Sequence, residues 1–289
     1  MMEISAKANK KTYKKALKGT RDYAVIALIG FIMIYPILVM FFASFKTNAE
    51  IYGSVALLPP KFKWTNFVEG WTSTGMSYTQ YFLNTFSLVI PTTLLTVCSS
   101  SLVAYGFARF RFPGQKLLFM VLIATMMLPQ SVTLITRYTM FAELGWLDSY
   151  LPFWIPALLC TNAFFPYMLI QFMRGLPKEL DESAYMDGAG TFTVLVRILL
   201  PLMKPAMFSA GVFQFLWAYN DYYNPLIYIS SVRNYPVSLA LRLSIDSEEV
   251  TNWGRVMAMS CVVVLPVILL YFLAQKSFVE GVATSGMKE

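Results

Sequence analysis

Six long apolar segments constrain this chain more than any other feature. Each has close to the roughly 20 residues that an α-helix needs to cross the hydrocarbon core of a bilayer. Within a bilayer, only helices and closed barrels satisfy their backbone hydrogen bonds internally. The sequence therefore predicts an all-α, polytopic membrane protein with about six transmembrane helices, over residues 23–44, 81–107, 117–134, 151–173, 206–230 and 256–274.

The composition agrees with this and excludes several chemistries. Hydrophobic residues make up 57% of the chain and charged residues 13%, against about 25% charged in a soluble domain. There is no histidine, which excludes histidine-based metal sites and catalytic triads. No phosphate-binding loop of the G-x-x-x-x-G-K-[ST] type is present. We expect no catalytic residues and no metal, and any nucleotide that drives the protein must bind to another chain.

The first 22 residues form a basic tail. The cluster stands immediately before an apolar segment, which is typical of a cytoplasmic anchor under the positive-inside rule. A cleaved signal peptide is the alternative, but the apolar run to residue 44 is too long for one. We therefore predict a single transmembrane domain over residues 23–289, with both termini and residues 174–205 on the cytoplasmic side. The basic residues of the tail are Lys7, Lys10, Lys11, Lys14, Lys15, Lys18 and Arg21.

The segment over about 176–205, "LPKELDESAYMDGAGTFTVLVRILLPLMKP", is unusually polar for this chain. Leu176-Pro177 is expected to begin a helix, because proline is tolerated where the N–H has no partner. Acidic residues then favour the positive end of the helix dipole. Gly188-Ala189-Gly190 should end this helix, and Thr191 should cap a second one. The acids are Glu179, Asp181 and Glu182, and the apolar residues at helical spacing are Val194, Leu195, Ile198 and Leu199.

Two short helices meeting at a glycine elbow suit two different roles. Glu182 lies beside the small residues Ser183 and Ala184, and small residues allow another backbone to approach closely. In the first role, the segment docks into a groove of another protein. In the second role, it is an amphipathic linker that lies on the bilayer, which has the same sequence pattern. The residues alone leave both open.

A family resemblance favours the first role. Glu182-Ser183-Ala184, Gly188, Ile198 and Leu200-Pro201 stand at the spacing of the E-A-A-x(3)-G-x(9)-I-x-L-P loop of ABC importer membrane subunits, with serine for the first alanine. The segments "SFKTNAEIY", "AYGFARFRFPGQ", "MMLPQSVTLI", "WAYNDYYNPL" and "FVEGVATSGMKE" resemble, in order, those of carbohydrate importer permeases of the maltose type. Tyr219 and Thr136-Arg137 depart from that pattern, where tryptophan and a proline-containing segment are common.

The resemblance implies a permease of a binding-protein-dependent transport system in the bacterial inner membrane. Its coupling helices would dock on a cytoplasmic ATPase dimer, which would carry the ATP and Mg²⁺. A homologous permease, giving a heterodimer, and an extracytoplasmic solute-binding protein would complete the importer. Glu182 would pair with a basic residue of the ATPase, Ser183 and Ala184 would pack in its cleft, and Gly188 would form the elbow. The implied coupling residues are Glu182, Ser183, Ala184, Asp187 and Gly188.

The cargo implied is a sugar or oligosaccharide, and an amino acid, peptide or polyol is the alternative, because the coupling loop is shared among ABC importers.

Two other classes of protein are rival readings. A self-sufficient secondary transporter would need an ion or proton site near the membrane midplane, and only Asp221 among the apolar segments could serve as its acid. An intramembrane enzyme is disfavoured by the missing histidine and the lack of any recognisable nucleophile motif.

The fifth apolar segment carries candidates for the substrate pathway. Polar groups inside a membrane are costly, which makes them functional candidates, and aromatic faces with amides suit a sugar. An aromatic belt at the membrane interface is the alternative. Gln130 is a further candidate, because Pro129 should open its helix locally. The candidates are Gln130, Trp217, Tyr219, Asn220, Asp221, Tyr222 and Asn224; weaker ones are Ser99, Ser100, Ser101, Asn162 and Gln171.

Overall fold

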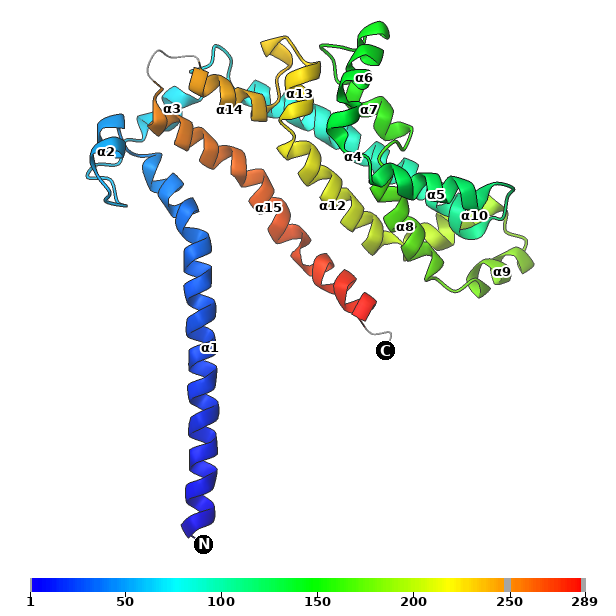
Figure 1. Cartoon of the computed structure of the whole chain (residues 1–289), viewed down its shortest axis with the longest axis horizontal. Helices are drawn as coiled ribbons and strands as arrows, with labels where there is room; N and C mark the ends of the chain where they lie inside the picture. Colours follow the sequence, from blue (N-terminus) through cyan, green and yellow to red (C-terminus); the bar gives the residue numbers. More distant parts are fainter. Residues whose placement is uncertain (1, 247–250, 287–289) are drawn as a thin grey trace. The chain divides into compact units, whose positions relative to one another are not determined.

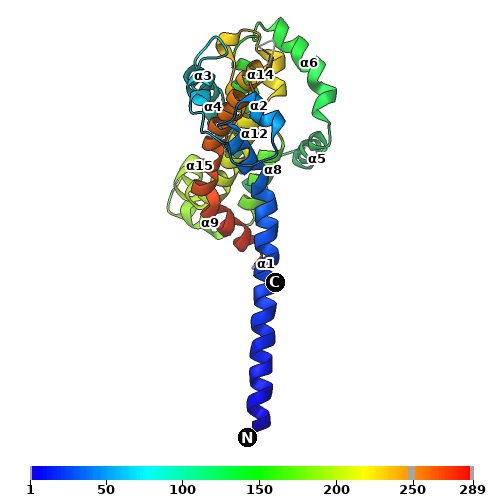
Figure 2. The same ribbon diagram turned by 90° about the vertical axis from the view of Figure 1, so that its left-hand side faces the viewer.

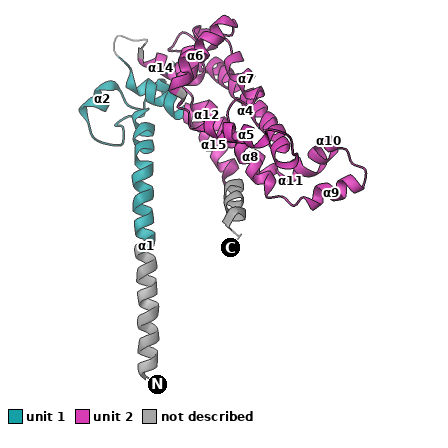
Figure 3. Cartoon of the chain, turned by 45° about the vertical axis from the view of Figure 1, so that its right-hand side comes forward, with its two compact units in different colours: residues 1–70, 248–262 teal, residues 71–247, 263–289 magenta. Residues whose placement is uncertain are grey.

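The computed structural model of the chain is built from helices (Figure 1), and no strand occurs over the residues that it describes, 2–246 and 251–286. Side chains are described for residues 22–129, 131–245 and 251–275. The chain forms two compact units (Figure 3), the first of residues 1–70 and 248–262 and the second of residues 71–247 and 263–289. The predicted all-α fold is confirmed.

Three described helices are long and apolar enough to cross a membrane, and two further spans are possible if each of two bent helix pairs counts as one. The continuous spans are Asp22–Ala43 of α1 (Met2–Ala43), α4 (Tyr78–Arg109) and Trp253–Gln275 of α15 (Trp253–Gly286). The bent pairs are Gln115–Met126 with Ser131–Glu143, and Thr191–Leu202 with Lys204–Tyr219.

Three predicted spans are interrupted. Residues 117–134 belong to α5 (Gln115–Met126) and α6 (Gln130–Glu143), which meet at 103° (Figure 2). Pro129 stands at the N-cap of α6, because its ring cannot continue the preceding helix. Residues 151–173 form α7 (Leu151–Leu158) and α8 (Phe164–Arg174), and residues 206–230 form α12 (Lys204–Asn220) and α13 (Tyr223–Tyr228).

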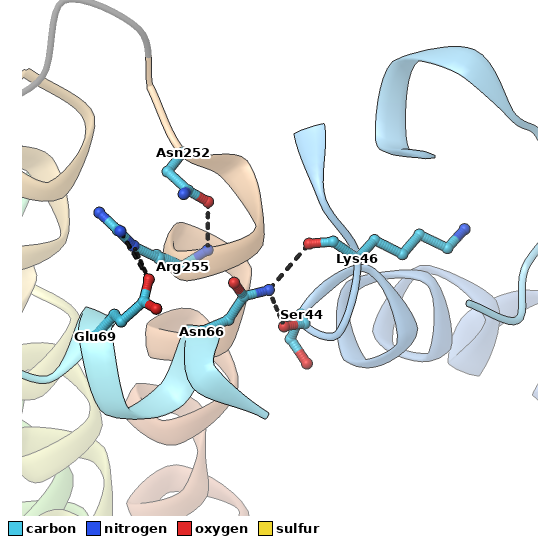
Figure 4. Close-up of polar contacts among 6 residues, drawn as sticks. All are labelled: Ser44, Lys46, Asn66, Glu69, Asn252 and Arg255. Atoms are coloured by element: carbon cyan, nitrogen blue, oxygen red, sulfur yellow. Dashed lines mark hydrogen bonds and ion pairs between the residues drawn. The ribbon is translucent and has the colours of Figure 1, made fainter. Parts of the chain in front are cut away.

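The segment after α1 is ordered within the first unit. It contains α2 (Asn48–Gly53), which begins with a capping box between Thr47 and Glu50, and α3 (Thr65–Gly70). The buried amide of Asn66 donates to the carbonyl oxygens of Ser44 at 2.8 Å and Lys46 at 2.9 Å (Figure 4). Arg255 of α15 pairs with Glu69 at 2.7 Å. The Asn66 bonds hold α3 to the chain just after α1, and the ion pair holds α3 to the start of α15.

Helix α4 is the centre of the second unit. It packs against α7, α8, α12 and α14 (Val237–Asp246). Its buried face carries small hydroxyl residues, which allow neighbouring helices to approach closely. Ser101 donates to the carbonyl oxygen of Val97 in its own helix at 2.7 Å, and Ser99 donates to that of Ala157 in α7 at 2.7 Å. The serines that were weak pathway candidates are thus packing residues.

Gly254 stands where other parts of the first unit leave no room for a side chain. A Cβ atom there would lie 2.3 Å from the carbonyl oxygen of Lys46 and 2.5 Å from the amide nitrogen of Asn66. We predict that Gly254→Ala displaces α3 from α15 and destabilises the protein by about 1–3 kcal/mol, the usual cost of overpacking. The measurement is thermal unfolding in detergent. Gly53→Ala is the control, because a Cβ at Gly53 meets nothing within 4 Å, and equal melting temperatures for both variants would contradict the prediction.

Candidate functional site

The polar segment over residues 176–205, named the coupling segment after its predicted role, contains the predicted elbow. Helix α9 (Glu179–Met186) starts two residues after Pro177 and carries the three predicted acids in its first turn. The helix is followed, after its C-cap Asp187, by Gly188, whose φ is +80°. The N–H of Gly188 donates to Tyr185 at 3.0 Å and that of Ala189 to Ala184 at 2.9 Å, which is the hydrogen-bond pair of a Schellman motif. A left-handed residue at this position strongly favours glycine.

The second half of the segment is a helix in three parts. It consists of α10 (Thr191–Val194), a π-helical turn (Leu195–Leu199) and α11 (Leu200–Leu202). The predicted apolar face is confirmed, because Val194, Leu195 and Leu199 are buried in a core cluster to which α4 and α8 also contribute. The prediction that Thr191 caps this helix is wrong. Gly190, in an extended conformation with ψ 161°, holds the N-cap position and Thr191 is the first helical residue.

A buried ion pair fixes α9 to the end of α4. Nε of Arg109 lies 2.7 Å from Oδ2 of Asp181, and the two side chains are 4% and 11% exposed. The same guanidinium donates to the carbonyl oxygen of Leu176 at 3.2 Å and 3.3 Å. Burial raises the pKa of the Asp181 carboxyl, and the charge of Arg109 opposes that rise. Asp181 was predicted only as a residue complementing the helix dipole, and Arg109 was not predicted at all.

A second contact ties α4 to the other side of the elbow. The hydroxyl of Tyr105, one turn before Arg109, donates to the carbonyl oxygen of Thr191 at 2.9 Å. The last turns of α4 therefore hold both α9 and the start of α10. Because the two contacts lie on either side of Gly188, the elbow is fixed relative to a helix long enough to cross the membrane.

The implied coupling residues divide between surface and core. Glu182, Ser183, Asp187 and Gly188 are exposed, whereas Ala184 is only 7% exposed and packs in the core cluster of the chain itself. The surface around the elbow also carries two large apolar side chains that the sequence reasoning missed, Met186 and Phe192, which are 88% and 72% exposed. Their exposure on a segment rich in acids is the signal that could have found them.

The second unit contains a cavity of about 930 Å³. Trp217 and Asn224, two of the candidates for the substrate pathway, line it, and so does the weaker candidate Asn162. Arg137 of α6 also lines it, at a position where the sequence departs from the family pattern. The remaining walls come from the α5–α6 turn, α6 itself, α7 and the start of α8.

Two further candidates make contacts of a structural kind. Tyr219 is 4% exposed and its hydroxyl donates to the carbonyl oxygen of Val263 in α15 at 2.7 Å. Asp221 ends α12 and accepts hydrogen bonds from the backbone N–H of Asn224 at 3.1 Å and its side-chain amide at 2.7 Å, which stabilise the first turn of α13.

Two other candidates, Asn220 and Tyr222, do not line the cavity. Asn220 is exposed and donates to the carbonyl oxygen of Leu216 in its own helix at 2.8 Å. Tyr222 is half-buried and its ring packs against that of Tyr223 at 5.5 Å. Gln130 is the first residue of α6, and its side chain lies outside the described residues. Asn220 and Tyr222 show that an aromatic, amide-rich run need not face one space.

The second unit thus combines an elbow fixed to a long apolar helix with a cavity lined by broken helices. Residues 97–283 match the family described as binding-protein-dependent transport system inner membrane component. The chain therefore belongs to that family.

Curated relatives and a solved structure agree. The chain is 30% identical to the trehalose/maltose transport system permease protein MalG of Thermococcus litoralis, over 90% of this chain and 94% of the relative. It is 29% identical to the arabinooligosaccharides transport system permease protein AraQ of Bacillus subtilis, over 90% and 92%. A chain in the crystal structure of a bacterial ABC transporter that imports the acidic polysaccharide alginate has the same fold, with a TM-score of 0.74, 21% identity and coverage of 90% and 96%.

The buried ion pair gives the first prediction for this site. Asp181→Ala leaves the Arg109 guanidinium buried without its partner, which costs about 3–5 kcal/mol. We expect a clear loss of thermal stability in the detergent-solubilised protein. Asp187→Ala is the matched control, because this exposed acid makes no such pair and surface changes usually stay within about 0.5 kcal/mol. Equal losses in the two variants would show that the pair does not hold α9.

The elbow gives the second prediction. Gly188→Val forces a β-branched residue into a left-handed conformation, which costs at least about 1–2 kcal/mol, and we expect poor assembly or transport uncoupled from ATP hydrolysis. Gly190→Val is the control, since Gly190 has φ −75° and a Cβ there meets nothing within 4 Å. Unchanged transport by the Gly188 variant would refute the prediction.

Proposed function

We propose that this chain is one of two membrane subunits of an ATP-driven, binding-protein-dependent importer of sugars or oligosaccharides. The observation that carries the proposal is the coupling segment, an elbow bound on both sides of Gly188 to the last turns of α4. Family membership supports it, and so do the relatives, whose names include maltose, trehalose and arabinooligosaccharides.

The exposed surface of the elbow suits a protein partner. Glu182 offers a carboxylate for a charge-assisted hydrogen bond, and Met186 and Phe192 offer apolar side chains that are costly to leave in water. A cleft on a cytoplasmic ATPase with a basic residue and an apolar floor would satisfy all three. A lipid surface would take the apolar pair but would repel the acids where anionic lipid is present.

The coupling mechanism follows from how the elbow is held. A push on α9 passes through the Arg109–Asp181 pair into the last turn of α4. Because α4 is the central helix of its unit and packs against α7, α8 and α12, its displacement would move the helices that line the cavity. Packed helices shift as rigid bodies between discrete arrangements, which suits alternation between inward- and outward-facing states.

The remaining parts of the importer are assigned by the same proposal. This chain is not an enzyme; ATP and Mg²⁺ bind to the partner ATPase dimer. A homologous permease completes a heterodimer, and a solute-binding protein delivers the cargo to the outer face. The coupling segment and both termini lie in the cytoplasm, consistent with the basic residues of the N-terminal tail. Within the second unit, the coupling segment lies at the opposite end of α4 from α14 (Figure 1), so α14 would face outward.

Gentle extraction of the chain from its native membrane, followed by mass spectrometry, tests the proposal. We expect a homologous permease and an ABC ATPase to be recovered with it. Hydrolysis by that complex, together with its binding protein, should rise with one or more oligosaccharides and stay at its basal level with amino acids, peptides and polyols. Stimulation of ATP hydrolysis by one of these other solutes would show that the cargo is that solute and not a sugar. A chain that is recovered alone and transports without ATP would overturn the proposal.

The exposed apolar residue next to the elbow gives a separate prediction. Met186→Asp places a charge on a side chain that the fold of this chain does not bury. We expect the variant to be as stable as the wild type but to recover at least about tenfold less ATPase, since burying an unpaired charge at an interface is strongly unfavourable. Met186→Leu is the control and should recover the normal amount. Equal recovery with both variants would show that the elbow docks elsewhere.

A further inference from the structure

Among the residues that the structure describes, the cavity has one charged side chain in its wall. That residue is Arg137 of α6, and the other lining residues are apolar, aromatic, hydroxyl or amide residues. The polar ones include Thr133, Asn162 and Asn224, and the indole of Trp217 supplies an aromatic face. Acidic residues are absent from the described lining. The cavity thus has a positive charge beside groups that suit a sugar ring.

The guanidinium of Arg137 has an unused donor. Its Nε is buried and finds no hydrogen-bond partner among the described residues. A guanidinium keeps its charge and has five donors in a planar fork. A charge without a direct ion-pair partner near the hydrocarbon region of a membrane is expensive and usually serves transport. The structure therefore keeps a costly group that its own packing does not satisfy.

The nearby acid does not neutralise this group by direct pairing. Asp221 is close enough to attract Arg137, but its two carboxylate oxygens accept hydrogen bonds from the backbone and side-chain N–H groups of Asn224. Its place at the end of α12 is thereby fixed. Tyr228, which also lines the cavity, lies within the field of Arg137 as well. Tyr228 therefore bounds the space in which an incoming group would meet the guanidinium.

We propose that the cavity accepts acidic sugars, and that Arg137 binds a carboxylate of the cargo. A planar guanidinium matches a planar carboxylate through two parallel hydrogen bonds. Trp217 would cover an apolar face of the sugar ring, while Asn162 and Asn224 would bond its hydroxyls. A single arginine suits one carboxylate per ring better than a phosphate, which commonly recruits several donors or a helix N-terminus. The inference rests on the proposed function and narrows its substrate class to uronic acid oligosaccharides.

The experiment measures binding to the complex purified with its permease partner and ATPase, but without the binding protein, whose own preference would otherwise dominate. The probes are trimers of galacturonate, glucuronate and mannuronate, each compared with its neutral counterpart by isothermal titration calorimetry. At least one uronate trimer should bind more tightly than the neutral trimer. Arg137→Gln should weaken that binding by about tenfold, the usual value of a charge-assisted hydrogen bond, and Arg137→Lys should recover part of it.

A matched control separates the cavity from general charge effects. Arg233→Gln removes a cation from an exposed position outside the cavity and should leave uronate binding unchanged. Neutral trimers that bind as well as every uronate, or a uronate preference that survives Arg137→Gln, would overturn the inference while leaving the importer intact. A preparation without any ATPase would instead refute the proposed function, and the inference with it.

Discussion

Arg109 and Asp181 form a buried contact between the last turn of a helix that crosses the membrane and the first turn of a short exposed one. Each charge would be costly to bury without the other. The pairing of the two charges therefore holds the two segments together. The position of α9 follows from this pair, and the Schellman turn at Gly188 then sets the direction of α10. Tyr105 holds the start of α10 to the same helix. The exposed surface of α9 that includes Glu182, the proposed coupling surface, is thereby attached to α4.

The cavity depends on a different constraint. Irregular backbone at membrane depth is tolerated only where it is buried in protein or lines a cavity. The helix breaks at Leu128, before α6, and at residues 161–163, before α8, both contribute to the lining, and Asn224 lies just after the break that ends α12. Broken helices around a binding region are common in transporters. The interruptions are therefore consistent with a substrate pathway that these helices surround.

Local patterns were sufficient for part of this structure. The apolar segments, the acidic first turn of α9, the elbow at Gly188 and the buried face after it all depend on residues close in sequence. The pair between Arg109 and Asp181 could not be predicted, because nothing local relates residues so far apart. The breaks within apolar segments were also hidden, since hydropathy is equally high on both sides of a break and Pro129 alone signalled one.

Thr191 was misplaced because Gly190 already adopts the extended N-cap conformation. Tyr219 belongs to the same aromatic, amide-rich run as the cavity residues Trp217 and Asn224, but its hydroxyl donates to α15.

The central claim is that the elbow and α4 move as one body when the ATPase closes. It is tested most directly by the distance between spin labels at Met186, on the exposed surface of α9, and Arg111, just after α4, in the complete importer with Cys98, Cys160 and Cys261 replaced. We predict one narrow distance distribution that is the same in the nucleotide-free and ATP-bound complexes. A distribution that broadens or shifts when ATP binds would show that α9 moves independently of α4, and would contradict the account.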